Sequence, residues 1–406
     1  MVVVSGVGFE GPLAPLAAAF EAELRRLGYA QDTVKRHLGV AAHLSCWLLS
    51  EGRCVRDLGV GVVVDAFLAE RRNEGHTQSV SPRSLVPFIT FVSGLGLVSG
   101  SPSVASSSPL EVFLARYRTF LLDERGLVPS GAKRCVDIAR VFLAERVGGA
   151  GELDVEGLRA ADVSAFVLRI SMERGRSAAR EFVKRLRTLL RFLHAEGLTA
   201  SSLAAAVPKV ASWRLAGLPQ ALPAGDVVRL LAACDPNRRA GRRDLAILML
   251  LVRLGLRSAE VAQLELDDVD WRAGELVIRG KGDRWERLPL PVDVGEALVD
   301  YVRFGRPSTA LDRRCFIRHL APHRGLTPGA VGALVYAAGQ RAGLDRPVRA
   351  HRLRHSAATN LLAAGAGLVE VGQLLRHRDQ VTTAIYAKVD RSALRILARP
   401  WPVVAS

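Results

Sequence analysis

The 406-residue sequence contains little that would support a disulfide-bonded protein. Its five cysteines are scattered at positions 46, 54, 135, 234 and 315, and no two form a C-x-x-C pair. Neither a disulfide framework nor a zinc ribbon is expected, and the pattern favours a reducing, cytoplasmic location. No Lys or Arg precedes Arg25, so the start of the sequence lacks the charged region of a signal peptide.

Long apolar runs are also missing. The longest uncharged stretch, residues 84–110, is interrupted by Pro87, several glycines and a serine-rich end. About 20 apolar residues are needed to cross a bilayer, so this stretch is too short and no membrane partner is expected. The apolar run at 245–252 spans eight residues, which predicts a helix in a protein core.

Acidic residues are fewer than basic ones. The chain has 56 Lys and Arg against 40 Asp and Glu, a net charge of +16. Residues 1–107 carry nine charges of each sign, residues 108–214 carry eighteen basic and twelve acidic residues, and residues 215–406 carry twenty-nine and nineteen. A basic globular chain is typical of a polyanion binder, and the asymmetry assigns that binding to the second and third segments.

Two loops divide the sequence into three predicted domains, 1–107, 108–214 and 215–406. The Ser/Pro-rich stretch at 99–109 and the Gly/Pro-containing stretch at 211–223 are typical of linkers. The first two domains share an order of apolar positions, with 20–52 matching 113–146, 62–75 matching 162–175, and 87–100 matching 188–201. Both therefore predict four-helix modules, the first a diverged copy of the second.

The third domain combines helices with strands. Residues 224–235 and 240–264 have apolar residues at helical spacing. Between 264 and 291, alternating residues flank turn signals at 272–274 and 280–283, which predicts a hairpin. The predicted fold class is mainly α with a small antiparallel β-sheet in the C-terminal domain. Helix N-caps are expected at Thr33, Ser130, Asp162 and Ser177.

Four motifs in the third domain place cationic side chains near a tyrosine. They are GLRSAEV, with Arg257 and Glu260 one helical turn apart; RGKGDRWERLPLP, with Lys281 at the hairpin tip; AHRLRHSAATNLLAAG, with His351, Arg354 and His355 at a helix start; and LLRHRDQVTTAIYAKV, with His377 nine residues before Tyr386.

These residue types suit phosphodiester chemistry. Two arginine forks can clamp a phosphoryl group as charge builds up, a tyrosine can form a covalent ester, and a lysine can deliver a proton to a leaving oxygen. No Walker loop is present. Asp267, Asp268 and Asp270 could suggest magnesium, but they precede a predicted strand and fit a solvated turn better.

The motifs resemble those of the tyrosine recombinase (phage integrase) family across residues 215–395, in family order. Residues 108–214 resemble that family's core-binding domain, so the resemblance implies helical SAM-like modules ahead of a catalytic domain. It implies that Tyr386 is the nucleophile and forms a 3′-phosphotyrosyl link. Arg257 and Arg354 would hold the non-bridging oxygens, with Glu260 orienting the Arg257 helix.

The resemblance also implies the remaining roles. His351 would assist proton transfer with Tyr386, His377 would hydrogen-bond the phosphate, and Lys281 would protonate the 5′-hydroxyl leaving group. No cofactor and no metal would be required. The implied partners are double-stranded DNA and other protomers in a tetrameric synapse, or partner recombinases. The implied outcome is integration, excision or transposition of DNA.

The sequence departs from the family at Leu375–Arg376–His377, where the family usually has Gly before the histidine, and at Lys388, where it often has His. We expect Arg376 to point outward or to contact DNA. The C-terminal tail at 390–406 is expected to dock on a neighbouring protomer or to pack on its own domain. In the neutral first domain, Arg25, Arg26, Lys35 and Arg36 are candidates for a residual DNA contact.

Other interpretations remain open at this level. Each residue alone has a plainer one: a surface ion pair for Arg257 and Glu260, a solvated turn for Lys281, or a zinc-binding pair for His351 and His355. The chain could be a catalytically inactive DNA-binding architectural factor. It could also be a type IB topoisomerase-like enzyme, which shares this chemistry.

Overall fold

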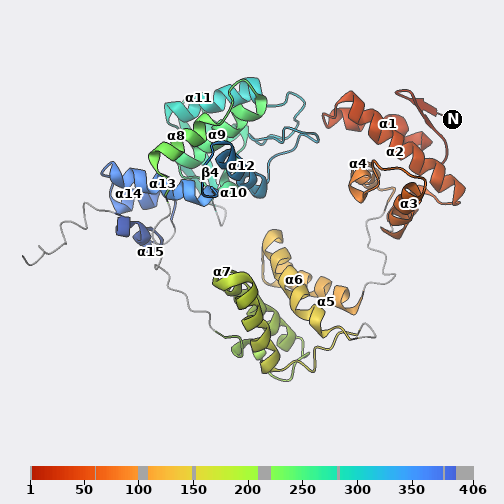
Figure 1. Cartoon of the computed structure of the whole chain (residues 1–406), viewed down its shortest axis with the longest axis horizontal. Helices are drawn as coiled ribbons and strands as arrows, with labels where there is room; N and C mark the ends of the chain where they lie inside the picture. Colours follow the sequence, from red (N-terminus) through yellow and green to blue (C-terminus); the bar gives the residue numbers. More distant parts are fainter. Residues whose placement is uncertain are drawn as a thin grey trace, which may run out of the picture. The chain divides into compact units, whose positions relative to one another are not determined.

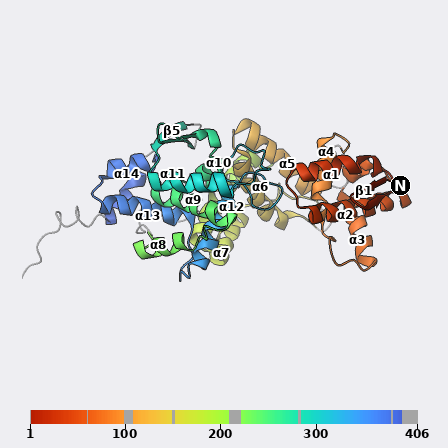
Figure 2. The ribbon, with the colours of Figure 1, turned by 90° about the horizontal axis from the view of Figure 1, so that it is seen from above.

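The computed structural model describes residues 2–59, 61–98, 108–148, 152–208, 221–280, 284–377 and 380–389. Packing divides the chain into two units, one containing residues 1–100 and 215–406, the other residues 101–214. The described residues are mainly helical with small antiparallel sheets (Figures 1 and 2), which confirms the predicted fold class. None of their helices has the length and apolar character required to cross a membrane.

The N-terminal part is a small helical module with its own hydrophobic core. It comprises β1 (Val2–Val4), β2 (Val7–Phe9), α1 (Ala17–Arg26), α2 (Gln31–Ser50), α3 (Gly61–Asn73) and α4 (Val86–Gly94). Apolar residues at helical spacing on α2, including Val34, Leu38 and Leu48, are buried against α1 and α4. The β1–β2 ribbon is an addition that the sequence patterns did not predict; its strands pair through a turn at Ser5 and Gly6.

The second unit is built from α5 (Pro109–Thr119), α6 (Pro129–Leu143) and α7 (Ala160–Ala195), and α7 consists of two helices that meet at Gly175. Helix α6 packs against both α5 and α7 (Figure 1). The buried face of α7 includes Leu186 and Phe192, and Phe192 contacts the ring of Phe113. Gly175 interrupts the helical backbone of α7 with φ 75° and ψ 167°, a region that glycine enters without steric cost.

Three of the four expected helix N-caps, those at Thr33, Ser130 and Asp162, are wrong. Thr33 is the third residue of α2, and Ser130 is the second residue of α6. Asp162 lies inside α7 and reaches back, accepting a 2.9 Å hydrogen bond from the amide of Arg159. A carboxylate three residues into a helix can satisfy the first free N–H group as well as a cap does. Ser177 lies within α7, two residues beyond the interruption at Gly175.

The C-terminal part holds most of the predicted site. It comprises α8 (Ala224–Ala232), α9 (Arg239–Arg253), α10 (Ser258–Gln263), β3 (Val269–Asp270), β4 (Glu275–Gly280), β5 (Arg284–Pro289), α11 (Val292–Asp300), α12 (Pro328–Arg341), α13 (Ala350–Ala363), α14 (Leu368–Leu374), α15 (Gln380–Thr383) and the 3-10 helix η9 (Ala384–Val389). Helix α9 is central and contacts α8, α10, α11, α12 and α13 (Figure 1). The apolar run at 245–252 lies on this helix in the core, as predicted.

The segment predicted as one helix at 240–264 is two helices, and Gly255 is the reason. Its φ of 58° ends α9, and a β-carbon at this position would lie 2.7 Å from a methyl carbon of Leu375. Glycine is therefore required both by the backbone conformation and by close packing. The turn brings Arg257 to the start of α10.

The small sheet has the order β3-β4-β5 and is antiparallel throughout, as predicted. Leu276 and Ile278 of β4 and Leu288 of β5 face the core, while the intervening residues are more exposed. The β4–β5 pairing begins at Gly280 and Arg284, and the hairpin belongs to the same part as α10 and α14 (Figure 2). Residues 281–283 lie outside the described residues.

Candidate active site and nucleic-acid interface

Arg257 occupies the N-cap of α10, where it pairs with Glu260. Its backbone is extended, and its amide donates a 2.8 Å hydrogen bond to Oε2 of Glu260. Its side chain donates through Nη1 to Oε1 of the same carboxylate at 2.5 Å. A carboxylate in the first turn of a helix satisfies free N–H groups. Glu260 therefore fixes the local backbone and the guanidinium together.

Arg354 is a buried arginine on α13. It is 8% exposed, and its two terminal nitrogens donate to the backbone carbonyls of Gly255 and Leu375. Burial, reinforced by the guanidinium of Arg257, lowers the pKa of Arg354 to about 10. The side chain therefore remains charged at neutral pH, and a charge held in a desolvated position interacts strongly with an incoming anion.

The chain segment after α14 brings the two arginines together. Arg354 donates to the carbonyl of Leu375, and Nη2 of Arg257 donates to the next carbonyl, that of Arg376, at 3.4 Å. His377 follows directly. Three of the predicted site residues, from separate motifs, thus meet at one helix end.

The side chain of Arg376 points into the protein, which corrects the expectation that it faces outward or contacts DNA. It is 3% exposed, and its Nη2 donates a 2.8 Å hydrogen bond to Oε2 of Glu260. Its Nη1 donates to the carbonyl of Leu374 at 2.7 Å. A buried guanidinium requires a compensating anion, and Glu260 provides it.

Tyr386 lies on η9 with its ring 2% exposed. Its hydroxyl is 2.7 Å from Nδ1 of His355, and the two ring centroids are 5.6 Å apart. Burial raises the pKa of Tyr386, against the opposing effect of Arg354. In this arrangement the hydroxyl is protonated at neutral pH, so its proton would have to be removed before the oxygen could attack as a nucleophile.

His351 lies one turn before His355 on α13 and is exposed. Their ring centroids are 6.0 Å apart. Burial lowers the pKa of each histidine, so both are neutral at pH 7. The contact between Nδ1 of His355 and Tyr386, with Arg354 adjacent in sequence, argues against a zinc site on this pair.

His377 packs beside the predicted nucleophile. Its ring is nearly parallel to that of Tyr386, at 8° with centroids 6.4 Å apart, and its Nδ1 is 2.8 Å from Oγ1 of Thr383. Burial and the nearby guanidinium of Arg354 lower the pKa of His377 to about 4. The imidazole is therefore neutral at neutral pH, where it can donate a hydrogen bond but contributes no charge.

Lys281, the predicted general acid, falls on residues 281–283 and lies outside the described residues. The strands on either side of it are described. Across them the guanidinium of Arg279 stacks 4.5 Å above the ring of Trp285 and forms salt bridges with Asp268 and Glu265. These contacts join the hairpin to the turn that follows α10.

The residues that could bind a metal ion have other partners. Asp267 and Asp268 pair with Arg313 and Arg279, and Asp270 accepts hydrogen bonds from backbone amides of the following turn. The plainer interpretation of this acidic run as a turn therefore fits. In the first module, His43, Glu74 and His76 bring ligand atoms within 4.8 Å of one another. However, Arg71 places a guanidinium nitrogen 2.7 Å from Nδ1 of His43, which opposes a cation.

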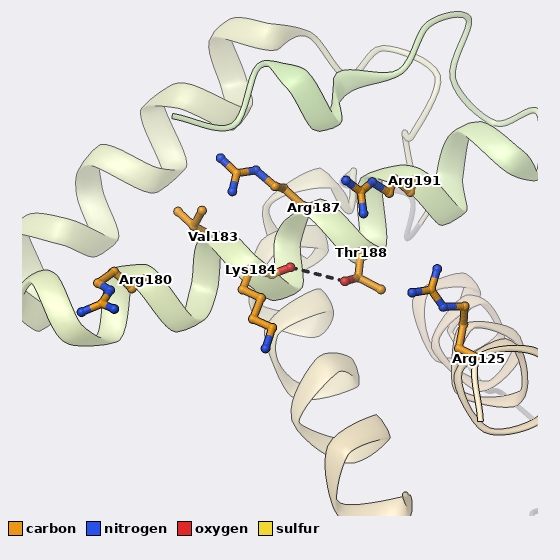
Figure 3. A pocket seen from close by; sticks show the side chains of 7 residues that line it. All are labelled: Arg125, Arg180, Val183, Lys184, Arg187, Thr188 and Arg191. Atoms are coloured by element: carbon orange, nitrogen blue, oxygen red, sulfur yellow. Dashed lines mark hydrogen bonds between the residues drawn. The ribbon is translucent and has the colours of Figure 1, made fainter. Parts of the chain in front are cut away.

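A second cationic site lies on the second unit. A groove of about 540 Å³ is lined by Arg125, Arg180, Val183, Lys184, Arg187, Thr188 and Arg191. Figure 3 shows these side chains, most of them from α7. Five of the seven are cationic and none is acidic, so the groove is suited to the phosphates of a polyanion.

Sequence reasoning missed two contacts of the site. His355 was assigned only a metal-binding alternative, although it is the histidine that contacts the tyrosine hydroxyl. Thr383, 4% exposed, holds His377. The position of Thr383, three residues or one helical turn before Tyr386, was the available signal.

Comparison with known proteins shows the family of the chain. A sequence model of the phage integrase family matches residues 220–392. The integrase/recombinase y4rA of Sinorhizobium fredii is 39% identical over 399 residues, covering 97% of this chain and 95% of that protein. Tyrosine recombinase XerD of Listeria monocytogenes is 30% identical over 284 residues, covering 68% of this chain and 93% of XerD.

A solved structure shares the fold. A lambda integrase tetramer bound to a Holliday junction superimposes with a TM-score of 0.53 at 17% identity, covering 80% of this chain and 91% of that one. The chain belongs to the phage integrase family, the tyrosine recombinases, which are DNA strand-transferring enzymes. The match to relatives along almost the whole chain supports recombination over an architectural factor or a topoisomerase.

Proposed function

We propose that the protein cleaves and rejoins double-stranded DNA through a covalent bond to Tyr386. The observation that carries this proposal is the meeting of Arg257 and Arg354 at two successive carbonyls, immediately before His377. Two guanidinium groups so arranged can stabilise the charge of a phosphoryl group in its transition state. The nearby Tyr386 provides an oxygen nucleophile.

In the proposed reaction, the oxygen of Tyr386 attacks the scissile phosphorus while Arg257 and Arg354 hold the two non-bridging oxygens. The bond between phosphorus and O5′ breaks, and a 3′-phosphotyrosyl bond forms. Lys281 would donate a proton to the departing O5′. His351 would assist removal of the tyrosine proton, and His355 already contacts that hydroxyl.

The bond energy is retained in the phosphotyrosyl ester. Attack by the 5′-hydroxyl of another strand reverses the step and completes strand exchange, so no nucleotide cofactor or metal is needed in this scheme. His377, neutral at pH 7, would donate a hydrogen bond to the phosphate. The reaction would serve the integration, excision or transposition of DNA. We place the protein in the cytoplasm, where its five free cysteines would stay reduced.

For DNA binding we propose the three domains 1–107, 108–214 and 215–406, acting in a tetrameric synapse of like or partner protomers. Separate hydrophobic cores within residues 4–98, 110–207 and 222–386 support the division. The tetrameric state of lambda integrase on a junction supports the assembly. The predicted docking of the tail at 390–406 lies outside the described residues and stays part of this proposal.

Covalent capture tests the function. The full chain is incubated with a pool of nicked duplexes, in which loss of the short 5′-hydroxyl fragment traps the adduct. We expect a complex that resists SDS, and mass spectrometry of the digested complex should place the nucleotide on Tyr386. An adduct on another residue, or none across pools that include DNA flanking the gene, would overturn the assignment.

The basic groove makes a separate prediction about affinity. Lys184→Gln combined with Arg191→Gln should weaken binding to all duplex sequences alike, because phosphate contacts carry no sequence information. The affinity falls with salt, and each lost phosphate contact should reduce the absolute slope of log K against log salt by about 0.9. Fluorescence anisotropy on two unrelated duplexes over a salt series measures both effects.

A matched control comes from the first module. Arg25 and Arg26 pair with Glu21 and Glu23 at 2.7 and 2.5 Å on α1, so their charges are already balanced. The double substitution of Arg25 and Arg26 by Gln should leave the salt slope close to that of the wild type. If this control reduces the absolute slope as much as the groove variant does, the groove is not a distinct phosphate-binding site.

A further inference from the structure

Arg376 adds a third guanidinium to the predicted phosphate site. We propose that Arg376 is a positioning residue that balances the buried carboxylate of Glu260, so that the group formed with Arg257 keeps a net positive charge and Arg257 keeps its orientation for the phosphate. This rests on the proposed function, since it takes Arg257 as a phosphate ligand. Arg376 itself would not contact DNA.

The hydrogen bonds divide the carboxylate between the two arginines. Oε1 of Glu260 accepts from Nη1 of Arg257, and Oε2 accepts from Nη2 of Arg376 and from the amide of Arg257. The carboxylate is 4% exposed and Arg376 is 3% exposed, whereas Arg257 is 42% exposed. The buried pair is therefore Glu260 with Arg376, and Arg257 is the accessible member of the network.

The backbone at Arg376 points to a role for its side chain. Its φ is 53°, a left-handed conformation that follows the end of α14. Glycine adopts this conformation at helix ends without steric cost, and a branched or long side chain does not. An arginine at this position bears that cost, and in return its side chain reaches Glu260 while its carbonyl accepts from Arg257.

The charges explain what Arg376 would contribute. A carboxylate paired with Arg257 alone would cancel the charge of that arginine and repel a phosphate, most strongly where little water screens it. With Arg376 present, the three groups carry a net charge of +1. Burial would by itself raise the pKa of Glu260, but Arg376 and Arg257 together hold it below its usual value. The carboxylate stays ionised and needs a counter-ion.

A purely structural role for Arg376 predicts a different effect when Arg376 and Glu260 are substituted together. In that case, each further loss of a contact in the network would harm the reaction more. In the electrostatic role, removal of the carboxylate should compensate for removal of Arg376. The sign of the coupling between the two positions therefore decides between these explanations.

The experiment measures single-turnover formation of the covalent adduct at saturating DNA, with affinity measured separately. The variants are Arg376→Gly, which suits the backbone, and Arg376→Gln, which keeps a donor but removes the charge. Each is combined with Glu260→Gln. Ser79→Gly is the control, because Ser79 also has a positive φ, 57°, but lies in the first module.

We expect each Arg376 variant to form the adduct about tenfold more slowly, and each double variant to recover most of that loss. Ser79→Gly should react at the wild-type rate, and thermal denaturation should find all variants folded. A wild-type rate for Arg376→Gly, or double variants no faster than the single ones, would refute the proposal. Failure of the wild type to form any adduct would instead refute the proposed function.

Discussion

Tyr386→Phe should abolish formation of the covalent protein–DNA complex while leaving DNA affinity nearly unchanged. Phenylalanine keeps the buried ring but lacks the oxygen that would bond to phosphorus. On a nicked suicide duplex, denaturing gels should resolve an adduct with the wild type and none with the variant. Anisotropy on the same duplex measures the affinity.

Tyr301 provides the matched control. It is another buried tyrosine, 1% exposed, and its hydroxyl accepts a 3.1 Å hydrogen bond from the amide of Ile317. Tyr301→Phe removes an equivalent buried hydroxyl, which costs about 1–3 kcal/mol of stability, but it should still form the adduct. EDTA should not inhibit the wild type. An adduct formed by Tyr386→Phe would show that the nucleophile is another residue.

The features that were correctly predicted depend on local patterns. The hairpin followed from alternating residues around 272–274 and 280–283, because a strand exposes every second side chain. The pairing of Arg257 with Glu260 followed from their spacing of three residues. Both need only the geometry of one element, which the local sequence determines.

The burial of Arg376 could not be predicted in this way. Arginine is normally exposed, and its partner Glu260 lies 116 residues earlier in the chain. Only the tertiary fold, which brings the residues after α14 to the start of α10, places the two together. The same reason explains His355, whose contact with Tyr386 joins residues 31 positions apart. The position of Gly255, by contrast, contained a usable signal, since glycine commonly ends a helix.

Arg354→Lys should lower the rate of the chemical step by about 10²–10³, the loss typical when one preorganised donor to a transition-state oxyanion is removed. Two terminal nitrogens of Arg354 are fixed by the carbonyls of Gly255 and Leu375, which aims the remaining N–H groups. Lysine keeps the charge but has a single ammonium, so it cannot occupy both carbonyls and also face the phosphate. Single-turnover adduct formation at saturating DNA measures the loss.

The conservative exchange is more informative than alanine because it separates charge from geometry. If charge alone were needed, Arg354→Lys would react nearly as fast as the wild type, and the two carbonyl contacts would be incidental. Arg341→Lys is the control, since Arg341, at the end of α12, forms a partly exposed salt bridge with Asp244 of α9; this variant should react at the wild-type rate. Thermal denaturation of both variants is measured as well, because Arg354→Lys leaves a buried carbonyl unpaired, which costs about 1–3 kcal/mol of stability. A folded Arg354→Lys protein with the predicted loss would show that the planar fork, held by two backbone carbonyls, is what the phosphate requires.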